Sequence, residues 1–116
     1  MKDTDALAAL AALSQENRLA VFRLLVQAGP DGLPAGRVAD KLDIAPSALT
    51  FHFDKLRAAG LATVRRDGRS MIYAAQFNAM NALLGFLTEN CCQGEPEKCA
   101  PAICRPAKRK PAKITA

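Results

Sequence analysis

The chain has 116 residues, of which 50% are hydrophobic and 23% are charged, as is typical of a single globular domain. Its formal net charge is +5, and residues 105–116 alone hold five basic residues and no acid. No segment approaches the roughly 20 apolar residues of a membrane span, and the acidic, alanine-rich start lacks the layout of a signal peptide. We therefore expect a cytoplasmic protein with no membrane partner, whose four cysteines are reduced thiols.

Two helices are predicted at the start of the chain. Residues 4–13 are rich in alanine and place Leu7, Leu10 and Leu13 at helical spacing, so this helix is either ordinary core or a dimer contact. Residues 15–28 carry a wide apolar face, which predicts a central core helix ended by a Gly-Pro-Asp-Gly turn.

A pair of short helices joined by a turn is predicted from Arg37 to Gly60. Pro46 interrupts the helical pattern and can open the second helix at its first turn. The apolar residues of that helix begin at Leu49 and recur at i, i+4 and i+7, until Gly60 supplies a cap. The opposite face has side chains that can bond phosphate or base edges, or touch a thymine methyl: Ser47, Thr50, Phe51 and Asp54, flanked by Lys55 and Arg57.

A β-hairpin is predicted next, with strands at residues 61–66 and 71–75. Asp67-Gly68 lies between them, and both of these residues can take a positive φ. Residues 55–69 hold five basic residues and one acid, a local charge of +4 that suits a polyanion. A solvated charge cluster without function is the alternative. The basic residues are Lys55, Arg57, Arg65, Arg66 and Arg69.

The last predicted helix, residues 77–90, is apolar on more than one side and so needs a partner. Because the first helix has the same character, we expect a two-fold homodimer in which first and last helices pack together. Periodicity is lost beyond Asn90, and prolines recur there among basic residues, which predicts a mobile tail.

Three motifs resemble those of the ArsR/SmtB family of winged helix-turn-helix repressors. Residues 13–19, LSQENRL, look like the opening L(A/S)xxxRL of that family. Residues 47–61, SALTFHFDKLRAAGL, look like its recognition-helix signature SxxSxHLxxLxxAGL, with Thr50 and Phe53 in place of the usual serine and leucine. Residues 66–73, RDGRSMIY, match its wing motif R(E/D)GRxxxY. The resemblance covers residues 5–90 and implies a mainly α fold with a small β-hairpin, a winged helix-turn-helix that dimerises and binds double-stranded operator DNA.

The resemblance also implies which side chains meet DNA. The family's recognition helix enters the major groove, and its wing meets phosphate or the minor groove. His52 takes the place of the family's near-constant histidine, and beside an apolar face it is a packing or orienting residue more often than a ligand. The predicted DNA contacts are Ser47, Thr50, Phe51, Lys55, Arg66 and Arg69.

The four cysteines suggest the effector. Residues 38–47 contain no cysteine and residues 77–90 no histidine, so neither the arsenic site nor the zinc site familiar from other family members is present. Three thiolates satisfy trivalent arsenic, and antimonite would bind the same sulfurs. The ligands we expect are Cys91, Cys92 and Cys99, with Cys104 as a further candidate. The three resemble the NCCxGxxxC ending of arsenic repressors with a C-terminal triad, here with one more residue before the last cysteine.

The expected function is therefore a repressor that leaves its operator when arsenite, As(III), or antimonite binds. The chain would divide into a DNA-binding and dimerisation domain (1–90), a cysteine-rich effector segment (91–104) and a basic flexible tail (105–116). Alternatives are a zinc- or cadmium-responsive repressor, a methylarsenite sensor that uses Cys91 and Cys92 alone, a disulfide between these two, and a metal-sequestering or thiol-redox protein.

No enzymatic activity and no resident cofactor are expected. The chain has a single histidine, His52, no glycine-rich phosphate loop, and no base placed near a nucleophilic cysteine.

Overall fold

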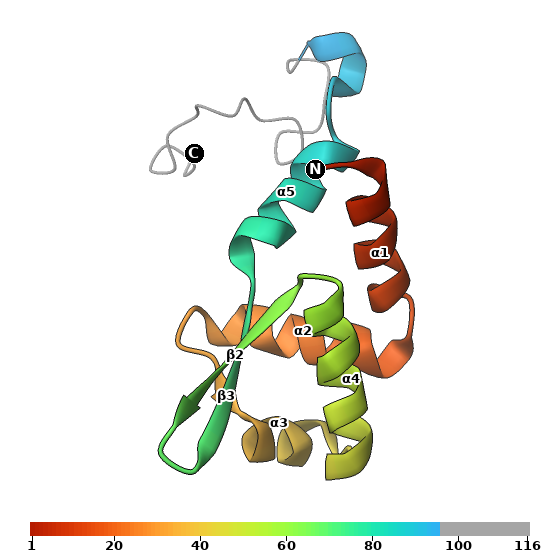
Figure 1. Ribbon diagram of the computed structural model, residues 1–116. Helices are drawn as coiled ribbons and strands as arrows, with labels where there is room; N and C mark the ends of the chain where they lie inside the picture. The colour runs from red at the N-terminus through yellow and green to blue at the C-terminus, as the bar shows by residue number, and fades with distance from the viewer. Residues whose placement is uncertain (96–116) are drawn as a thin grey trace. The chain divides into compact units, whose positions relative to one another are not determined.

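The computed structural model describes residues 1–95, and its elements follow the predicted order (Figure 1). Residues 1–83 form one compact unit, and a second unit begins at Leu84. Within the described residues no helix is long and apolar enough to cross a bilayer. The elements are α1 (Asp3–Leu13), α2 (Glu16–Ala28), β1 (Leu33–Pro34), α3 (Ala35–Leu42), α4 (Pro46–Ala58), β2 (Ala62–Asp67), β3 (Ser70–Ala75), α5 (Phe77–Leu87) and the 3-10 helix η1 (Cys91–Gly94).

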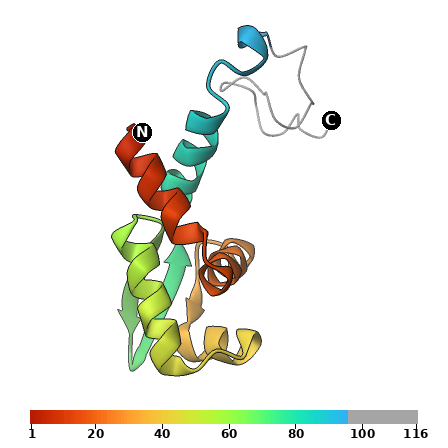
Figure 2. The same ribbon diagram turned by 90° about the vertical axis from the view of Figure 1, so that its right-hand side faces the viewer.

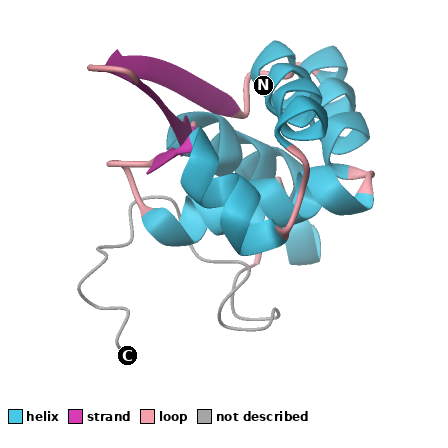
Figure 3. Ribbon diagram, turned by 90° about the horizontal axis from the view of Figure 1, so that it is seen from below, coloured by secondary structure: helices cyan, strands magenta, loops and turns pink. Residues whose placement is uncertain are grey.

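The mainly α fold with a small β-hairpin is confirmed, but the sheet has a third strand. All pairings are antiparallel and the order is β1-β3-β2, so β3 is central (Figure 3, strands in magenta). The added strand pairs only Leu33 with Tyr73 and Pro34 with Ile72. A strand of two residues is too short to show an alternation of apolar and polar side chains, and proline is rare in strands except at sheet edges. The sequence pattern therefore did not predict β1.

The hairpin turn lies one residue later than predicted. Asp67 pairs with Ser70, so the two-residue loop is Gly68-Arg69 rather than Asp67-Gly68. Gly68 alone in this loop has a positive φ, 65°, and glycine adopts that conformation without steric cost.

The last helix is shorter than predicted. It ends at Leu87 instead of Asn90. Asn90 has a φ of 57°, in the left-handed region that asparagine tolerates better than most residues, and this conformation cannot continue a right-handed helix.

The core of the first unit lies where α2 packs against α4 and β3 (Figures 1 and 2). Each leucine or phenylalanine buried there contributes about 1.5–3 kcal/mol to stability relative to an exposed one. The largest fully buried side chains are Val21, Leu25, Val38, Leu49, Phe53, Leu56 and Leu61.

Helix α1 packs against α2 and α4 with its alanines, not with its leucines. Ala6, Ala9 and Ala12 are buried, whereas Leu7 and Leu10 are 65% and 41% exposed. Small side chains on the buried face let the helix backbones approach closely. The interpretation of these two leucines as ordinary core is therefore wrong.

Both ends of α4 form as predicted. Pro46 occupies the first turn, where its missing N–H costs nothing. At the other end Gly60, with φ of 79°, donates its N–H to the carbonyl of Arg57, and Leu61 donates to Leu56. This pair of bonds is a Schellman motif, which satisfies the last carbonyls of the helix.

His52 is buried in α4, with 7% of its surface exposed. Its Nδ1 has no hydrogen-bond partner among the described residues. Burial lowers the pKa of His52 below 6.5, and the positive charge of Arg18 lowers it further. The side chain is therefore neutral in the folded protein near pH 7, as suits a packing residue.

We expect Gly32→Ala to destabilise the fold more than Gly60→Ala. Both glycines have positive φ, which costs alanine about 1–2 kcal/mol. A Cβ at Gly32 would also overlap the carbonyl oxygen of Tyr73, whereas one at Gly60 would meet nothing within 4 Å. Urea unfolding at matched protein concentrations should therefore show an additional cost at Gly32 of at least about 1 kcal/mol. Equal losses would contradict the close approach of this loop to β3.

We expect His52 to lower the free energy of unfolding as the pH is decreased below about 6.5, the pKa of histidine in the unfolded chain. Because the folded pKa is lowered, the unfolded chain takes up a proton that the folded chain does not. The contribution of His52 to the free energy of unfolding is fully present above that pH, and it is lost as the pH falls toward the lowered pKa. Urea unfolding between about pH 5 and 7 should show this decline in the wild type and a flatter profile in His52→Leu. Parallel profiles would show that another group is responsible.

Candidate nucleic-acid interface

The exposed face of α4 carries every DNA contact that was predicted for this helix. Leu49, His52, Phe53 and Leu56 are buried on the other side. This division follows from the 3.6-residue period, because one apolar stripe packs on the core and leaves the remaining positions in solvent. The predicted contacts on the exposed face are Ser47, Thr50, Phe51 and Lys55.

Three of the exposed side chains have partners within α4. The hydroxyl of Thr50 donates to the carbonyl of Pro46 at 3.1 Å. The ammonium of Lys55 lies 5.2 Å from the ring centroid of Phe51, a cation–π distance. The helix therefore presents an aromatic ring and a cation together at the centre of its exposed face.

The three arginines of the hairpin differ in their surroundings. The guanidinium of Arg65 donates to the backbone carbonyl of Asp31 at 3.2 Å, which ties β2 to the loop before β1. Arg66 and Arg69 are exposed and make no hydrogen bond or ion pair with any described residue. Successive side chains of a strand point to opposite faces, so Arg65 and Arg66 cannot share one partner surface. The structure thus leaves Arg66 and Arg69, the two predicted contacts, available for phosphate.

Helix α4 and the hairpin are joined by a buried aromatic contact. The rings of Phe53 and Tyr73 stack with centroids 3.6 Å apart and an angle of 4° between their planes. The carbonyl of Leu61, directly before β2, accepts a backbone hydrogen bond at 2.8 Å from the N–H of Gln76, directly after β3. The exposed face of α4 and the basic hairpin are therefore held in a fixed arrangement by a shared packing contact.

Two further basic residues were missed in the sequence. Arg37 and Lys41 are exposed on α3. In a helix-turn-helix the first helix crosses the sugar-phosphate backbone while the second enters the groove, so exposed cations on α3 suit phosphate. Their spacing of four residues, which puts both on one helical face, was the available signal.

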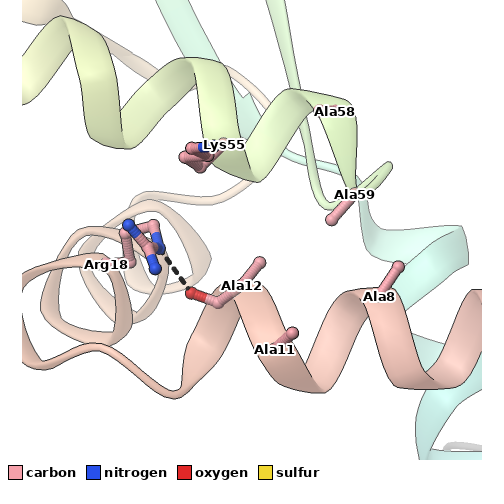
Figure 4. Close-up of a pocket in the computed structure, with 7 residues that line it drawn as sticks. All are labelled: Ala8, Ala11, Ala12, Arg18, Lys55, Ala58 and Ala59. Carbon is pink, nitrogen blue, oxygen red and sulfur yellow. Dashed lines mark hydrogen bonds between the residues drawn. The ribbon is translucent and has the colours of Figure 1, made fainter.

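A cavity of about 340 Å³ opens between α1 and α4 (Figure 4). At one end Arg18 donates from Nε to the carbonyl of Ala12 at 2.8 Å, satisfying a carbonyl in the last turn of α1. Arg18 is thus structural, and it links the start of α2 to the end of α1. The lining residues are Ala8, Ala11, Ala12, Arg18, Lys55, Ala58 and Ala59.

The predicted effector ligands are described only in part. Cys91 and Cys92 lie in η1 with their sulfurs 3.8 Å apart. Cys99 and Cys104 lie outside the described residues. Among the residues up to 95, no group of three or more histidine, cysteine or carboxylate side chains is placed to hold a metal ion.

The two described cysteines are not bonded to each other. Cys92 is a free thiol, and its sulfur lies 3.8 Å from that of Cys91, too far for an S–S bond, so the predicted alternative of a disulfide between them is wrong. Cys92 has a φ of 54°, a left-handed conformation that accompanies the close approach of the two sulfurs.

Comparison with known proteins agrees with this architecture. Residues 13–65 match the model of a helix-turn-helix domain family. The HTH-type transcriptional regulator YceK of Bacillus subtilis is 38% identical over 77 residues, which are 66% of this chain and 76% of that protein.

Two solved structures show the same fold. The ArsR-like transcriptional regulator from Rhodococcus sp. RHA1 has a TM-score of 0.67 at 25% identity, over 78% of this chain and 83% of that one. NolR from Sinorhizobium fredii has a TM-score of 0.60 at 31% identity, over 74% and 83%. The chain belongs to the ArsR-like family of winged helix-turn-helix transcriptional regulators.

Proposed function

We propose that this protein is a cytoplasmic, metalloid-responsive repressor. It binds operator DNA as a homodimer and is released when trivalent arsenic or antimony binds Cys91, Cys92 and Cys99. The observation that carries the DNA-binding half is the joined surface of α4 and the hairpin, with exposed Phe51 and Lys55 on the helix. The effector half rests on the paired sulfurs in η1.

Electrostatics and geometry both support binding of a duplex. Helix α4 is 13 residues long and exposes one face, as a helix that lies in a major groove must. Arg66 and Arg69 follow on the hairpin with no described partner of their own, so their charges can neutralise phosphates. Ser47, Thr50 and Phe51 are the groove contacts in this proposal.

Exposed leucines support the homodimer. Leu7 and Leu10 on α1, and Leu84 and Leu87 on α5, are 41–65% exposed. Large apolar side chains gathered along a helix gain about 25 cal/mol for each Å² that a partner removes from water. A second copy that covers them would place two α4 helices on one duplex, so that each takes one half-site.

The cysteine pair supports a soft, thiophilic effector. Two sulfurs that bind one ion at about 2.3 Å with a tetrahedral angle lie about 3.8 Å apart, so the observed separation lets one ion bridge them. Arsenite takes three sulfurs, the third of which comes from Cys99 in this proposal. Both cysteines bind the ion as thiolates, so the proposal requires their reduced form.

A methylarsenite sensor is the second candidate. A methylated trivalent arsenical has two exchangeable positions, and the two sulfurs 3.8 Å apart would satisfy both without Cys99.

The hairpin arginines give a quantitative test of DNA binding. Arg66→Ala or Arg69→Ala should weaken binding to operator and to random DNA alike, because phosphate contacts carry no sequence information. For a dimer, each should lower the slope of log affinity against log salt by about 1.8, or 0.9 per lost contact. Fluorescence anisotropy across a salt series measures this.

Arg65→Ala is the matched control for this experiment. Its guanidinium is bonded to the carbonyl of Asp31, so we expect a smaller change in the salt slope. Equal slopes for the wild type, Arg66→Ala and Arg69→Ala would contradict the proposed role of the hairpin.

The effector is tested by titrating the reduced repressor–operator complex with arsenite. We expect affinity to fall by about 5–150-fold, the usual range of allosteric coupling. Cys91→Ser, Cys92→Ser and Cys99→Ser should each abolish the response, whereas Cys104→Ser should retain it. A Cys99→Ser protein that still responds to methylarsenite would favour the second candidate. Operator binding that saturating arsenite leaves unchanged would sink the effector half of the proposal.

A further inference from the structure

We infer that Phe51 is a specificity-determining residue that contacts the 5-methyl group of a thymine in the major groove. This inference rests on the proposed DNA-binding function, and it identifies the base that Phe51, on the exposed face of α4, recognises. The occupant is a thymine of each operator half-site, recognised by its methyl group and not through hydrogen bonds.

The exposed ring of Phe51 would be stabilised by contact with an apolar group on a bound partner. Its side chain is 53% exposed, whereas Phe53, two positions later, is 1% exposed in the core. The helical period separates these rings onto opposite faces of α4. A large apolar ring left in water on the face that meets DNA gains by covering an apolar group there, and the major groove offers one such group, the thymine methyl.

Contacts within α4 hold the ring in place. The Lys55 ammonium lies 5.2 Å from the ring centroid. The ring of His52 approaches it edge-on, with centroids 5.9 Å apart and planes at 65°. With neighbours in the next turn and beside it, the Phe51 ring is oriented before DNA arrives, which lowers the entropic cost of binding.

The neighbours of Phe51 favour an apolar contact over hydrogen bonds to base edges. The Thr50 hydroxyl proton is already given to the Pro46 carbonyl at 3.1 Å, so Thr50 adds a methyl group to this surface. Adenine and guanine are usually recognised through bidentate contacts from asparagine, glutamine or arginine. Helix α4 contains no asparagine or glutamine, and its one arginine, Arg57, is paired with Asp54 at 3.7 Å.

The test replaces thymine by deoxyuridine, which removes the methyl group and keeps the base pair and its hydrogen-bonding edge. An operator is first selected from random duplexes by the full-length wild-type protein. Each thymine is then replaced in turn, and affinities are measured for the wild type, Phe51→Ala and Phe51→Leu. Helix content by circular dichroism confirms that the variants fold, as expected for substitutions at an exposed helical position.

At one thymine of each half-site, we expect deoxyuridine to weaken wild-type binding about fourfold, and about 15-fold when both half-sites are changed. Phe51→Ala should bind thymine and deoxyuridine operators equally, and Phe51→Leu should keep part of the preference. Arg69→Ala is the matched control: its affinity falls on both operators, yet it keeps the wild-type preference for thymine.

Other results would overturn the inference. If deoxyuridine weakens Phe51→Ala as much as the wild type, another side chain contacts the methyl, and loss of the preference in Thr50→Ser would identify Thr50. If the wild type binds a selected operator but is insensitive to deoxyuridine throughout, the inference fails while the proposed function stands. If no sequence is selected at all, both fail.

Discussion

The stacking of Phe53 on Tyr73 is the contact on which the candidate DNA-binding surface of α4 and the hairpin depends. Phe53 comes from α4, and Tyr73 lies in the central strand, where it pairs with Leu33 of β1 and Val64 of β2. A single aromatic pair therefore connects the helix to all three strands. Because both rings are buried, α4 and the hairpin cannot separate without exposing them to water, and this cost holds the two parts in a fixed relative position.

Local rules predicted α4 well. The apolar period placed Leu49 and Leu56 in the core, Pro46 set the start, and Gly60 set the end through a Schellman motif. Each of these features depends on residues within a few positions of one another, so the sequence pattern contains them. The exposure of the predicted groove contacts follows from the same period.

Features that depend on distant residues were not predicted. Strand β1 exists because Leu33 meets Tyr73, 40 positions away, and its two residues carry no pattern of their own. The orientation of α1 was likewise set by tertiary contact, because alanines that allow close approach displaced Leu7 and Leu10 from the buried face. Of the hairpin arginines, Arg65 is hydrogen-bonded, to the backbone carbonyl of Asp31. Every residue type has such a carbonyl, so the sequence could not predict which arginine would be bonded.

The buried alanine face of α1 also has a mechanical consequence. An alanine side chain has no rotatable χ angle, so Ala6, Ala9 and Ala12 hold α1 against its neighbours through contacts that cannot relax by changing rotamer. Long side chains at these positions could change rotamer when α1 moves, so that the neighbouring helices would not move with it. In a dimer closed on Leu7 and Leu10, α1 would act as a stiff spacer, and a small movement at the dimer interface would reach α4 nearly undiminished.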